Sequence, residues 1–187
     1  MKNLTTAAAG PVTKEDFKRS IHMLEAETDD DDLIDDLIAA AVAVVDTGTA
    51  HPMAAADFEF DVPAGPWGCW WFPVRPVNSV AKVEVMDADG VWTGDDAGGA
   101  YVVRGHDEPR LILPDALAES VRAAQAVRVT ANVGGAPTQQ HRQAVILLVK
   151  EWRDAGIAVE KIDAADLSFH IRALMKQVRY RRPLVTT

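Results

Sequence analysis

The hydrophobic and polar positions of this chain change their period twice. Apolar residues first recur at helical spacing, which predicts helices over about 13–25 and 30–47. Over about 56–134 the pattern shifts to short alternating or apolar runs separated by Gly, Pro and Asp, which indicates strands and turns. Helical spacing then returns over about 137–155 and 163–182. The chain therefore predicts an α+β fold.

This order of elements predicts one domain spanning 1–187. Its helices, at about 13–47 and 137–182, form a bundle of two N-terminal and two C-terminal helices, with a small antiparallel β region of about 56–134 inserted between them. A short tail, 183–187, follows Pro183. Five to seven short strands are expected in the insertion, and Asp115–Ala124 is expected as a short helix or turn.

Local signals place several boundaries. Thr13 with Asp16 three residues later predicts a capping box. Gly48 is expected to end the second helix and Pro137 to begin the third, because glycine favours helix ends and proline the first turn. Asp163 is expected to cap the last helix. Asp87-Ala-Asp-Gly90 predicts a hairpin turn.

The strand assignment of two stretches of the β region is less clear from their patterns. Trp67–Val74 is aromatic and bounded by prolines, which suits an edge strand or an irregular loop. The strand pairing of Asp95–Arg110 is not assigned by its pattern. Alternation over Val80–Met86 places Val83 and Val85 on one face of a strand.

Charge is segregated along the chain, and this changes the functional picture. The net charge is −9, which argues against a general nucleic-acid binder. Residues 25–36 carry eight acids and no base, whereas residues 167–187 carry five bases and no acid. Such separation is typical of recognition rather than of folding.

The acidic run Asp29, Asp30, Asp31 and Asp32 has three interpretations. The first is a solvated loop whose carboxylates favour the first turn of the next helix. The second is an electrostatic docking face, toward a basic partner, a neighbouring subunit or a channel. The third, a metal site, is the least favoured, because four consecutive acids cannot all converge on one ion.

Trp67, Trp70 and Trp71, with Phe72, form an aromatic cluster beside the single cysteine, Cys69. The cluster is interpreted as core of the β region, with a partner-facing hot spot as the alternative, since Trp is enriched at such sites. One cysteine excludes an intramolecular disulfide and a cysteine-cluster zinc site, and a packed side chain is expected.

Catalytic chemistry finds little support. The five histidines are scattered, and no zinc-binding pair, nucleophile elbow or phosphate loop occurs. We therefore expect no enzyme, no cofactor and no metal. A cleft enzyme that uses His51, or His106 beside Asp107, is the minor alternative. No apolar run reaches a membrane-spanning length, and the N-terminus lacks the layout of a signal peptide, so we expect synthesis in the cytoplasm.

The C-terminal end carries the clearest candidate site. Arg172, Lys176 and Arg179 share one face of the predicted helix. A solvated basic face, favoured by the helix dipole, is the simple interpretation. The absence of acids and the apolar end favour docking on another protein. The docking residues are then Arg172, Lys176, Arg179, Tyr180, Arg181, Arg182, Leu184 and Val185.

Three segments resemble the head–tail connector (adaptor) proteins of tailed bacteriophages and gene transfer agents. VTKEDFKRSI…DDDDLIDDLIAAAVAVVDTGTA resembles the first two helices of that family, and VRPVNSVAKVEVMDADGVW its proline-containing strand and hairpin. VRVTANVGGAP…HRQAVILLVKEW resembles its last strand, glycine turn and third helix. The resemblance covers roughly residues 12–182 and is carried by the joint order of these segments.

The resemblance implies a structural role in the neck of a phage or phage-like particle. Family members form a ring, typically of twelve subunits, beneath the portal; the ring continues the DNA channel and presents a surface to stopper or tail-completion proteins. Their C-terminal helix and tail contact the portal, which assigns that role here to the C-terminal residues given above. The resemblance implies synthesis in the bacterial cytoplasm, no membrane partner, and DNA that passes without specific binding. A DNA-binding packaging factor that uses the basic end is the alternative.

Overall fold

The computed structural model of the chain describes residues 1–5, 10–24, 26–94, 96–105, 108–156 and 167–183. These residues divide into two compact units. The helical unit spans Ala9–Ala54 and Ala136–Tyr180, and the strand unit spans Met1–Ala8, Ala55–Gly135 and Arg181–Thr187. The predicted fold class is confirmed as α+β, with five helices and two antiparallel sheets in the described residues.

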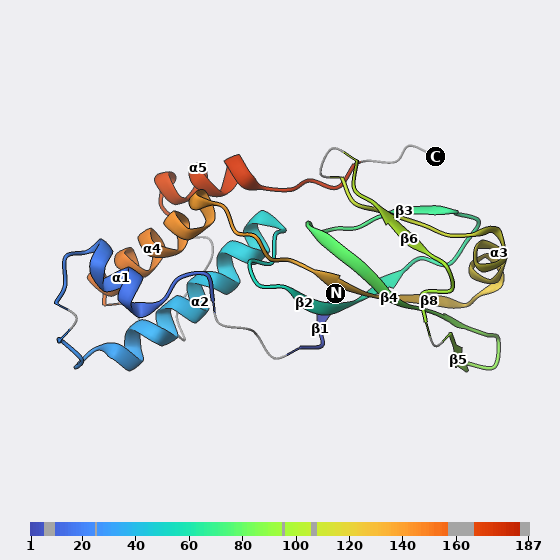
Figure 1. The fold of residues 1–187 in the computed structure, drawn as a ribbon, viewed down its shortest axis with the longest axis horizontal. Helices are drawn as coiled ribbons and strands as arrows, with labels where there is room; N and C mark the ends of the chain where they lie inside the picture. Colours follow the sequence, from blue (N-terminus) through green and yellow to red (C-terminus); the bar gives the residue numbers. More distant parts are fainter. Residues whose placement is uncertain (6–9, 25, 95, 106–107, 157–166, 184–187) are drawn as a thin grey trace. The chain divides into compact units, whose positions relative to one another are not determined.

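Four of the helices make up the helical unit (Figure 1). They are α1 (Lys14–Ser20), α2 (Asp31–Thr49), α4 (Gln139–Asp154) and α5 (Phe169–Val178). Helix α2 packs on α1, α4 and α5, and α4 also packs on α5. All four contribute to one apolar core, whose members buried to 1% exposure or less are Phe17, Ile34, Leu37, Ala41, Val45, Ala144, Val145, Leu148, Val149 and Ile171.

The predicted capping box of α1 is confirmed. The Asp16 backbone N–H donates to Thr13 Oγ1 at 3.2 Å, and the Thr13 N–H donates to Asp16 Oδ2 at 3.5 Å. This exchange satisfies two backbone donors that a helix start leaves open. The helix ends sooner than the apolar spacing predicts, because the chain turns at His22, whose φ of 58° is left-handed.

The expected stop at Gly48 is wrong. Helix α2 continues through Thr49, and Ala50 takes the left-handed capping conformation instead, with a φ of 54°. Glycine at position 48 lets the Met175 side chain of α5 approach closely, and a Cβ there would make the end of that flexible side chain move. Gly48 is thus a close-packing position inside the helix rather than the residue that ends it.

Two expected helix starts are also displaced. Thr138, not Pro137, is the N-cap of α4, and its backbone N–H donates to His141 Nδ1 at 3.1 Å. Helix α5 is capped by Ser168, whose Oγ accepts from the Ile171 N–H at 3.5 Å. The expected cap Asp163 lies outside the described residues. In both helices a hydroxyl residue next to the first turn replaces the expected cap or start.

The strand unit contains two sheets and the short helix α3 (Asp115–Ala123). The five-stranded sheet has the order β1-β2-β8-β4-β5, and the three-stranded sheet has the order β3-β7-β6; all pairings are antiparallel. The strands are β1 (Lys2–Asn3), β2 (Ala56–Val62), β3 (Cys69–Trp71), β4 (Val77–Met86), β5 (Trp92–Thr93), β6 (Tyr101–Val103), β7 (Arg110–Ile112) and β8 (Ala126–Val133).

The alternation that predicted β2 corresponds to a real burial pattern. Phe58, Phe60 and Val62 are buried, and the central strand β8 alternates in the same way along its length. Alternate residues of a strand point to opposite faces, so one face of this sheet is apolar and the other polar. The polar face carries cross-strand contacts such as Asn132 Nδ2 to Asp57 Oδ1, 2.8 Å.

Aromatic rings join the two sheets. The Phe60 ring of β2 lies 6.0 Å from the ring of Trp70 in β3 and 5.5 Å from that of Phe72, in edge-to-face geometry. Such pairs add about 0.5–1.5 kcal/mol beyond the area that they bury. Trp67–Val74 therefore contains an edge strand, β3, and its buried rings form the core between the sheets.

The expected hairpin at Asp87-Ala-Asp-Gly90 is confirmed between β4 and β5. Asp87 Oδ1 accepts from the backbone N–H groups of Asp89 and Val91, both at 2.9 Å, and Gly90 has a φ of 80°. The unassigned stretch from Asp95 contains β6, which pairs with β7. Among the described residues, no helix combines the length and apolar character needed to cross a bilayer.

Candidate interaction surfaces

The basic face of α5 is built on a buried apolar stripe. Ile171, Met175 and Val178 face the core of the helical unit, so the residues one position later on the helix point outward. Arg172, Lys176 and the C-cap residue Arg179 are all exposed. The Arg172 Nε donates to the Leu167 carbonyl at 2.6 Å, which ties this side chain to the start of its own helix.

The segment that follows α5 begins with a buried residue. Tyr180 is only 5% exposed, and its backbone N–H donates to the Thr49 carbonyl at 2.8 Å. Arg181 and Arg182 are exposed, and the Arg182 guanidinium carbon lies 5.1 Å from the centroid of the Trp70 ring. The accessible part of the tail therefore begins at Arg181. The predicted docking residues Leu184 and Val185 lie outside the described residues.

The acidic run is paired within the chain at two of its four positions. Asp31 Oδ1 lies 2.5 Å from Lys18 Nζ, and Asp30 Oδ2 lies 2.9 Å from Arg153 Nη2. Lys18 is 3% exposed and also donates to the Glu27 carbonyl. This hydrogen-bonded lysine lowers the pKa of the Asp31 carboxyl. These pairs connect the start of α2 to α1 and α4.

The other two acids of the run, Asp29 and Asp32, are exposed. The run therefore combines structural carboxylates with solvated ones. The sequence contains a sign of this pairing that counting charges within 25–36 does not detect. Lys14 and Lys18 are four residues apart and so share one face of α1. Lys14 Nζ lies 3.4 Å from Asp31 Oδ2. Within the described residues, no group of three or more potential ligands is arranged to hold a metal ion.

The three tryptophans occupy different environments. Trp70 is buried among the rings of Phe60 and Phe72. Trp67 is half-buried, and its Nε1 donates to the Pro63 carbonyl at 2.6 Å, whereas Trp71 is half-buried on the opposite face of β3 from Trp70. Trp70 is thus a core residue with the Arg182 guanidinium over its ring, and Trp67 and Trp71 remain partly accessible. Burial raises the pKa of the nearby Cys69 thiol.

The structure brings together two histidines that are far apart in the sequence. The rings of His51 and His141 are buried, with centroids 4.4 Å apart. Asp46 lies on the adjoining turn of α2, where burial raises its pKa to about 6 although its carboxylate accepts from the Met53 N–H at 2.9 Å. Nothing in the spacing of these residues indicated their contact. The rival pair His106 and Asp107 lies outside the described residues.

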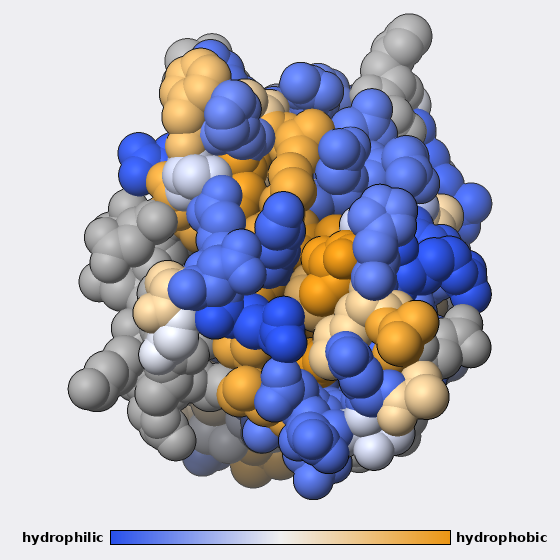
Figure 2. Space-filling model, turned by 90° about the vertical axis from the view of Figure 1, so that its left-hand side faces the viewer, coloured by the Kyte–Doolittle hydropathy of each residue, from blue (hydrophilic) through white to orange (hydrophobic). Residues whose placement is uncertain are grey.

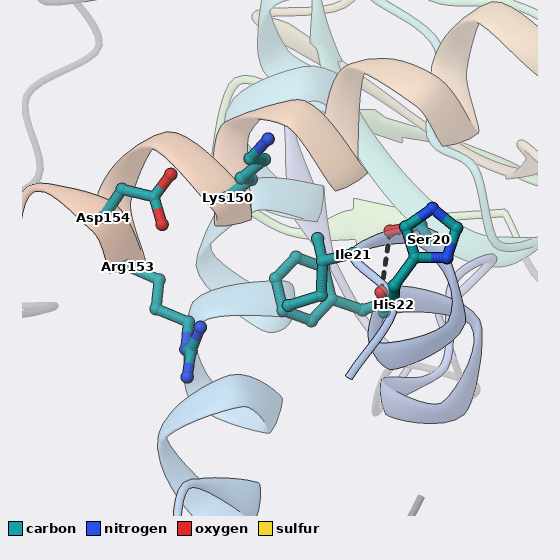
Figure 3. Close-up of a pocket in the computed structure, with 7 residues that line it drawn as sticks. Ser20, Ile21, His22, Lys150, Arg153 and Asp154 are labelled. Atoms are coloured by element: carbon teal, nitrogen blue, oxygen red, sulfur yellow. Dashed lines mark hydrogen bonds between the residues drawn. The ribbon is translucent and has the colours of Figure 1, made fainter. Parts of the chain in front are cut away.

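A polar cavity of about 440 Å³ lies between the end of α1 and α4 (Figure 3). Ser20, Ile21 and His22 line it from α1 and the turn that follows, and Lys150, Arg153 and Asp154 line it from α4. Arg153 already binds Asp30, and the Ser20 hydroxyl donates to the Phe17 carbonyl at 2.7 Å. Its polar groups are thus partly engaged in holding the helices together, and no nucleophile–base pair is formed in it.

A second hollow of about 330 Å³ lies between α4 and α5. It has apolar and uncharged polar walls, and we call it the α4–α5 groove. Its lining residues are Gln143, Leu147, His170, Ala173, Leu174 and Gln177. Phe169, next to His170, is 80% exposed.

The fold of this chain matches solved structures of gene transfer agent necks over nearly its full length. A chain in the neck of an empty gene transfer agent particle, computed with C6 symmetry, matches with a TM-score of 0.71 and 22% identity, covering 98% of this chain and 96% of that chain. A chain of the neck of a native particle, computed with C12 symmetry, matches with a TM-score of 0.69 and 25% identity, covering 98% and 97%. The chain has the fold of a gene transfer agent neck protein.

A third match to this neck fold comes from the virion of a native gene transfer agent particle, with a TM-score of 0.71, 24% identity, and coverage of 98% of this chain and 96% of that chain. These full-length matches confirm the resemblance expected from the sequence at the level of the fold. No family model and no curated protein sequence matches the chain. Local sequence patterns and backbone geometry therefore indicate the neck fold, although the overall sequence identity is low.

Proposed function

We propose that this chain is a structural head–tail connector, or adaptor, located in the neck of a phage or phage-like particle. The observation that supports this most directly is the full-length likeness to chains of gene transfer agent necks, with 96–97% of those chains covered. A likeness over both the helical and the strand unit is not expected from a shared supersecondary motif alone. The connector acts by association and carries out no turnover.

In this proposal, copies of the chain form a ring beneath the portal, of twelve subunits as is typical of the connector family. The bundle of terminal helices carries the ring contacts and the strand unit is the insertion. The acidic net charge of −9 is compatible with a channel through which DNA must slide, because clustered bases would bind phosphates and hold the DNA back. The ring presents its other side to stopper or tail-completion proteins.

The portal-facing element in this proposal is the basic end of the chain. Arg172, Lys176, Arg179 and Arg181 are exposed cations, suited to acidic groups on the portal. Leu184 and Val185 continue this element as an apolar end. Tyr180 supports this element in the proposal by anchoring its start to α2, because it is buried and its backbone N–H donates to the Thr49 carbonyl.

The proposal is tested by electron microscopy of particles from cells that express the chain with a tag. The expected result is tag density in a ring between head and tail. A chain that purifies free of particles, or as an oligomer with an occupied catalytic pocket, would contradict the proposal.

A truncation separates folding from docking. Deleting residues 181–187 leaves Tyr180 and its contact with Thr49 in place, so we expect a folded chain that no longer attaches to the portal. The matched control reverses Arg122, an exposed base at the end of α3, and should attach normally. Particles that contain the truncated chain at full occupancy would refute the docking role. Salt-sensitive binding of the free chain to DNA would favour a packaging factor instead.

A further inference from the structure

The two sheets of the strand unit differ on the faces that point away from their shared core. The outer face of the five-stranded sheet carries polar side chains from β2 and β8, which are Asp57, Glu59, Asp61, Arg128, Thr130 and Asn132. This is the usual pattern of an antiparallel sheet that packs on one side and meets solvent on the other. The three-stranded sheet departs from this pattern.

The strand register assigns the side chains of the three-stranded sheet to its two faces. Trp70, Leu111 and Val102 lie opposite one another, and the burial of Trp70 and Leu111 identifies this row as the inner face. The two flanking rows therefore point outward. They are Cys69, Ile112 and Tyr101 in one row and Trp71, Arg110 and Val103 in the other. We call these six residues the β3–β7–β6 outer face.

The β3–β7–β6 outer face is accessible and largely apolar. Tyr101 is 56% exposed and Arg110 is exposed, while the other four side chains are half-buried. The face of the molecule in Figure 2, by contrast, has apolar residues mixed with many hydrophilic ones. Large apolar side chains that stay accessible together are typical of a binding surface. Trp, Tyr and Arg, all present here, are the residue types that contribute most to protein–protein binding.

The charges of this face indicate the chemistry of the partner. Strands β3, β6 and β7 contain no acid, although residues 55–135 as a whole carry twelve acids and six bases. Arg110 forms no ion pair with any residue that the structure describes. A partner that covers this face must therefore bring apolar side chains and a carboxylate for Arg110. A nucleic acid is disfavoured, because its phosphates would also meet the acids of the same unit.

The basic tail reaches the same edge of this sheet. Strand β3 is an edge strand, and the Arg182 guanidinium carbon lies 5.1 Å from the centroid of the Trp70 ring at its centre. Cys69 and Trp71, the neighbours of Trp70 in β3, belong to the outer face. The tail and the outer face thus meet at one strand, so a partner that binds the tail is placed to cover the sheet as well.

We propose that the β3–β7–β6 outer face is a docking surface for the same protein partner that receives the basic tail. Trp71 and Tyr101 supply the apolar contact, and Arg110 pairs with a carboxylate of the partner. This inference rests on the proposed function, in which the partner is the portal, and it extends the binding surface from the tail to the sheet. It also separates the tryptophans, since Trp70 supports the sheet from inside and Trp71 faces the partner.

Two variants of the full-length chain test this surface. Tyr101→Ser removes the most exposed ring of the face, and Arg110→Glu reverses its charge. The probe is head particles purified from cells that lack the chain, and a quantitative gel measures the bound chain over a range of concentrations. Each variant should bind at least about 10-fold more weakly than the wild type. Arg110→Ala should fall between the wild type and Arg110→Glu, because only the reversal adds repulsion toward a carboxylate.

Matched controls come from the same unit. Val91→Ser removes an apolar side chain that is 55% exposed outside the three-stranded sheet, and Arg122→Glu reverses an exposed base of α3. Both controls should bind heads like the wild type. Urea denaturation should give nearly the wild-type free energy of unfolding for Tyr101→Ser and Arg110→Glu, because both side chains are exposed.

Three results would overturn the docking surface. The first is folded variants that bind heads like the wild type. The second is variants that lose only self-association, measured by sedimentation velocity, which would make the face a contact between copies. The third is variants that lose only binding to a DNA oligonucleotide, measured by fluorescence anisotropy, which would make the face a nucleic-acid site.

Failure of this surface is distinguishable from failure of the proposed function. A tagged wild-type chain found in the neck, together with variants that bind heads normally, refutes only the docking role of the sheet. A wild-type chain that is absent from the neck refutes the proposed function, whatever the variants do.

Discussion

The start of α2 and the helix α5 carry charges of opposite sign. They differ in whether those charges are paired within the chain. At α2, Asp31 binds Lys18 and Asp30 binds Arg153, both within the chain. At α5, Lys176 and Arg179 are exposed and form no ion pair with any residue that the structure describes. Asp30 and Asp31 thus contribute to the packing of α1 and α4, whereas the exposed Lys176 and Arg179 can meet another molecule.

The difference shows that a run of like charge does not by itself mark a binding surface. The acids lie opposite a helix whose lysines are spaced to meet them, and one of those lysines is buried. A buried cation must have a partner, because its desolvation is otherwise too costly. Exposed bases do not need such a partner, because an ion pair at the surface adds little to the free energy of unfolding.

The largest expected effect is on docking by α5. Reversing Lys176 and Arg179 to glutamate should weaken attachment to the portal on the order of 100-fold, because each reversal replaces an attraction with a repulsion. The free energy of unfolding should stay nearly unchanged, since both side chains are exposed. Particle occupancy by quantitative gel and urea unfolding measure the two quantities. Unchanged occupancy of the variant in particles would contradict the proposal that α5, unlike the start of α2, binds another molecule.

The next largest effect is on stability at α2. Replacing Lys18 by alanine removes a buried cation that binds Asp31 and the Glu27 carbonyl, so we expect a loss of about 2 kcal/mol in the free energy of unfolding. Lys14→Ala, at the more exposed lysine on the same face, is the matched control and should cost less. Urea denaturation of both variants measures the difference. Equal losses would mean that burial does not distinguish the two lysines.

A third effect is that the two ends of α2 should change the stability of the chain with pH in opposite directions. The Asp46 pKa is raised by burial to about 6 from an ordinary 3.8, so within that range the folded chain keeps a proton that the unfolded chain has lost. Stability should therefore fall as pH rises from 3.8 to about 6, and Asp46→Asn should remove this fall and stabilise the chain at neutral pH by about 2 kcal/mol.

Asp31 should behave in the opposite sense. Its lowered pKa means that its contribution is present above the ordinary value of 3.8 and is lost as the pH falls through the lowered value. Thermal unfolding of the wild type, Asp46→Asn and Asp31→Asn from acid to neutral pH resolves the two signs. An Asp46→Asn chain that keeps the fall in stability on approaching pH 6 would contradict the assignment.

The smallest effect is expected at the solvated acids. Asp29→Asn with Asp32→Asn should change the free energy of unfolding by no more than about 0.5 kcal/mol, because both side chains are exposed. Destabilisation comparable to that of Lys18→Ala would show that the whole run, and not only its paired half, is structural.

Much of the secondary structure was predictable because it depends on local chemistry. The capping box at Thr13, the alternation of β2 and the turn at Asp87 each involve residues close together in the sequence. The misplaced boundaries share another cause. Glycine commonly ends helices, but Gly48 lies inside α2, where its small size admits the Met175 side chain from more than a hundred residues away. No local pattern carries that information.

The candidate site likewise has features that local sequence predicts and features that depend on distant segments. The exposure of Arg172, Lys176 and Arg179 follows from the apolar stripe beside them, which the sequence displays. The burial of Tyr180 and the contact of Arg182 with Trp70 depend on segments that fold back from elsewhere. The partners of Asp30 and Asp31 likewise come from other helices, although the spacing of Lys14 and Lys18 indicated a shared face.

The sequence alone determined the class of the fold, the order of its elements and the separation of charge, because periodicity, caps and turns act over a few residues. Only the tertiary structure decided which charges are neutralised, which aromatics are core, and where the helical unit leaves a hollow between α4 and α5. Those properties depend on which surfaces meet, and they are set by packing between residues that are distant in the chain.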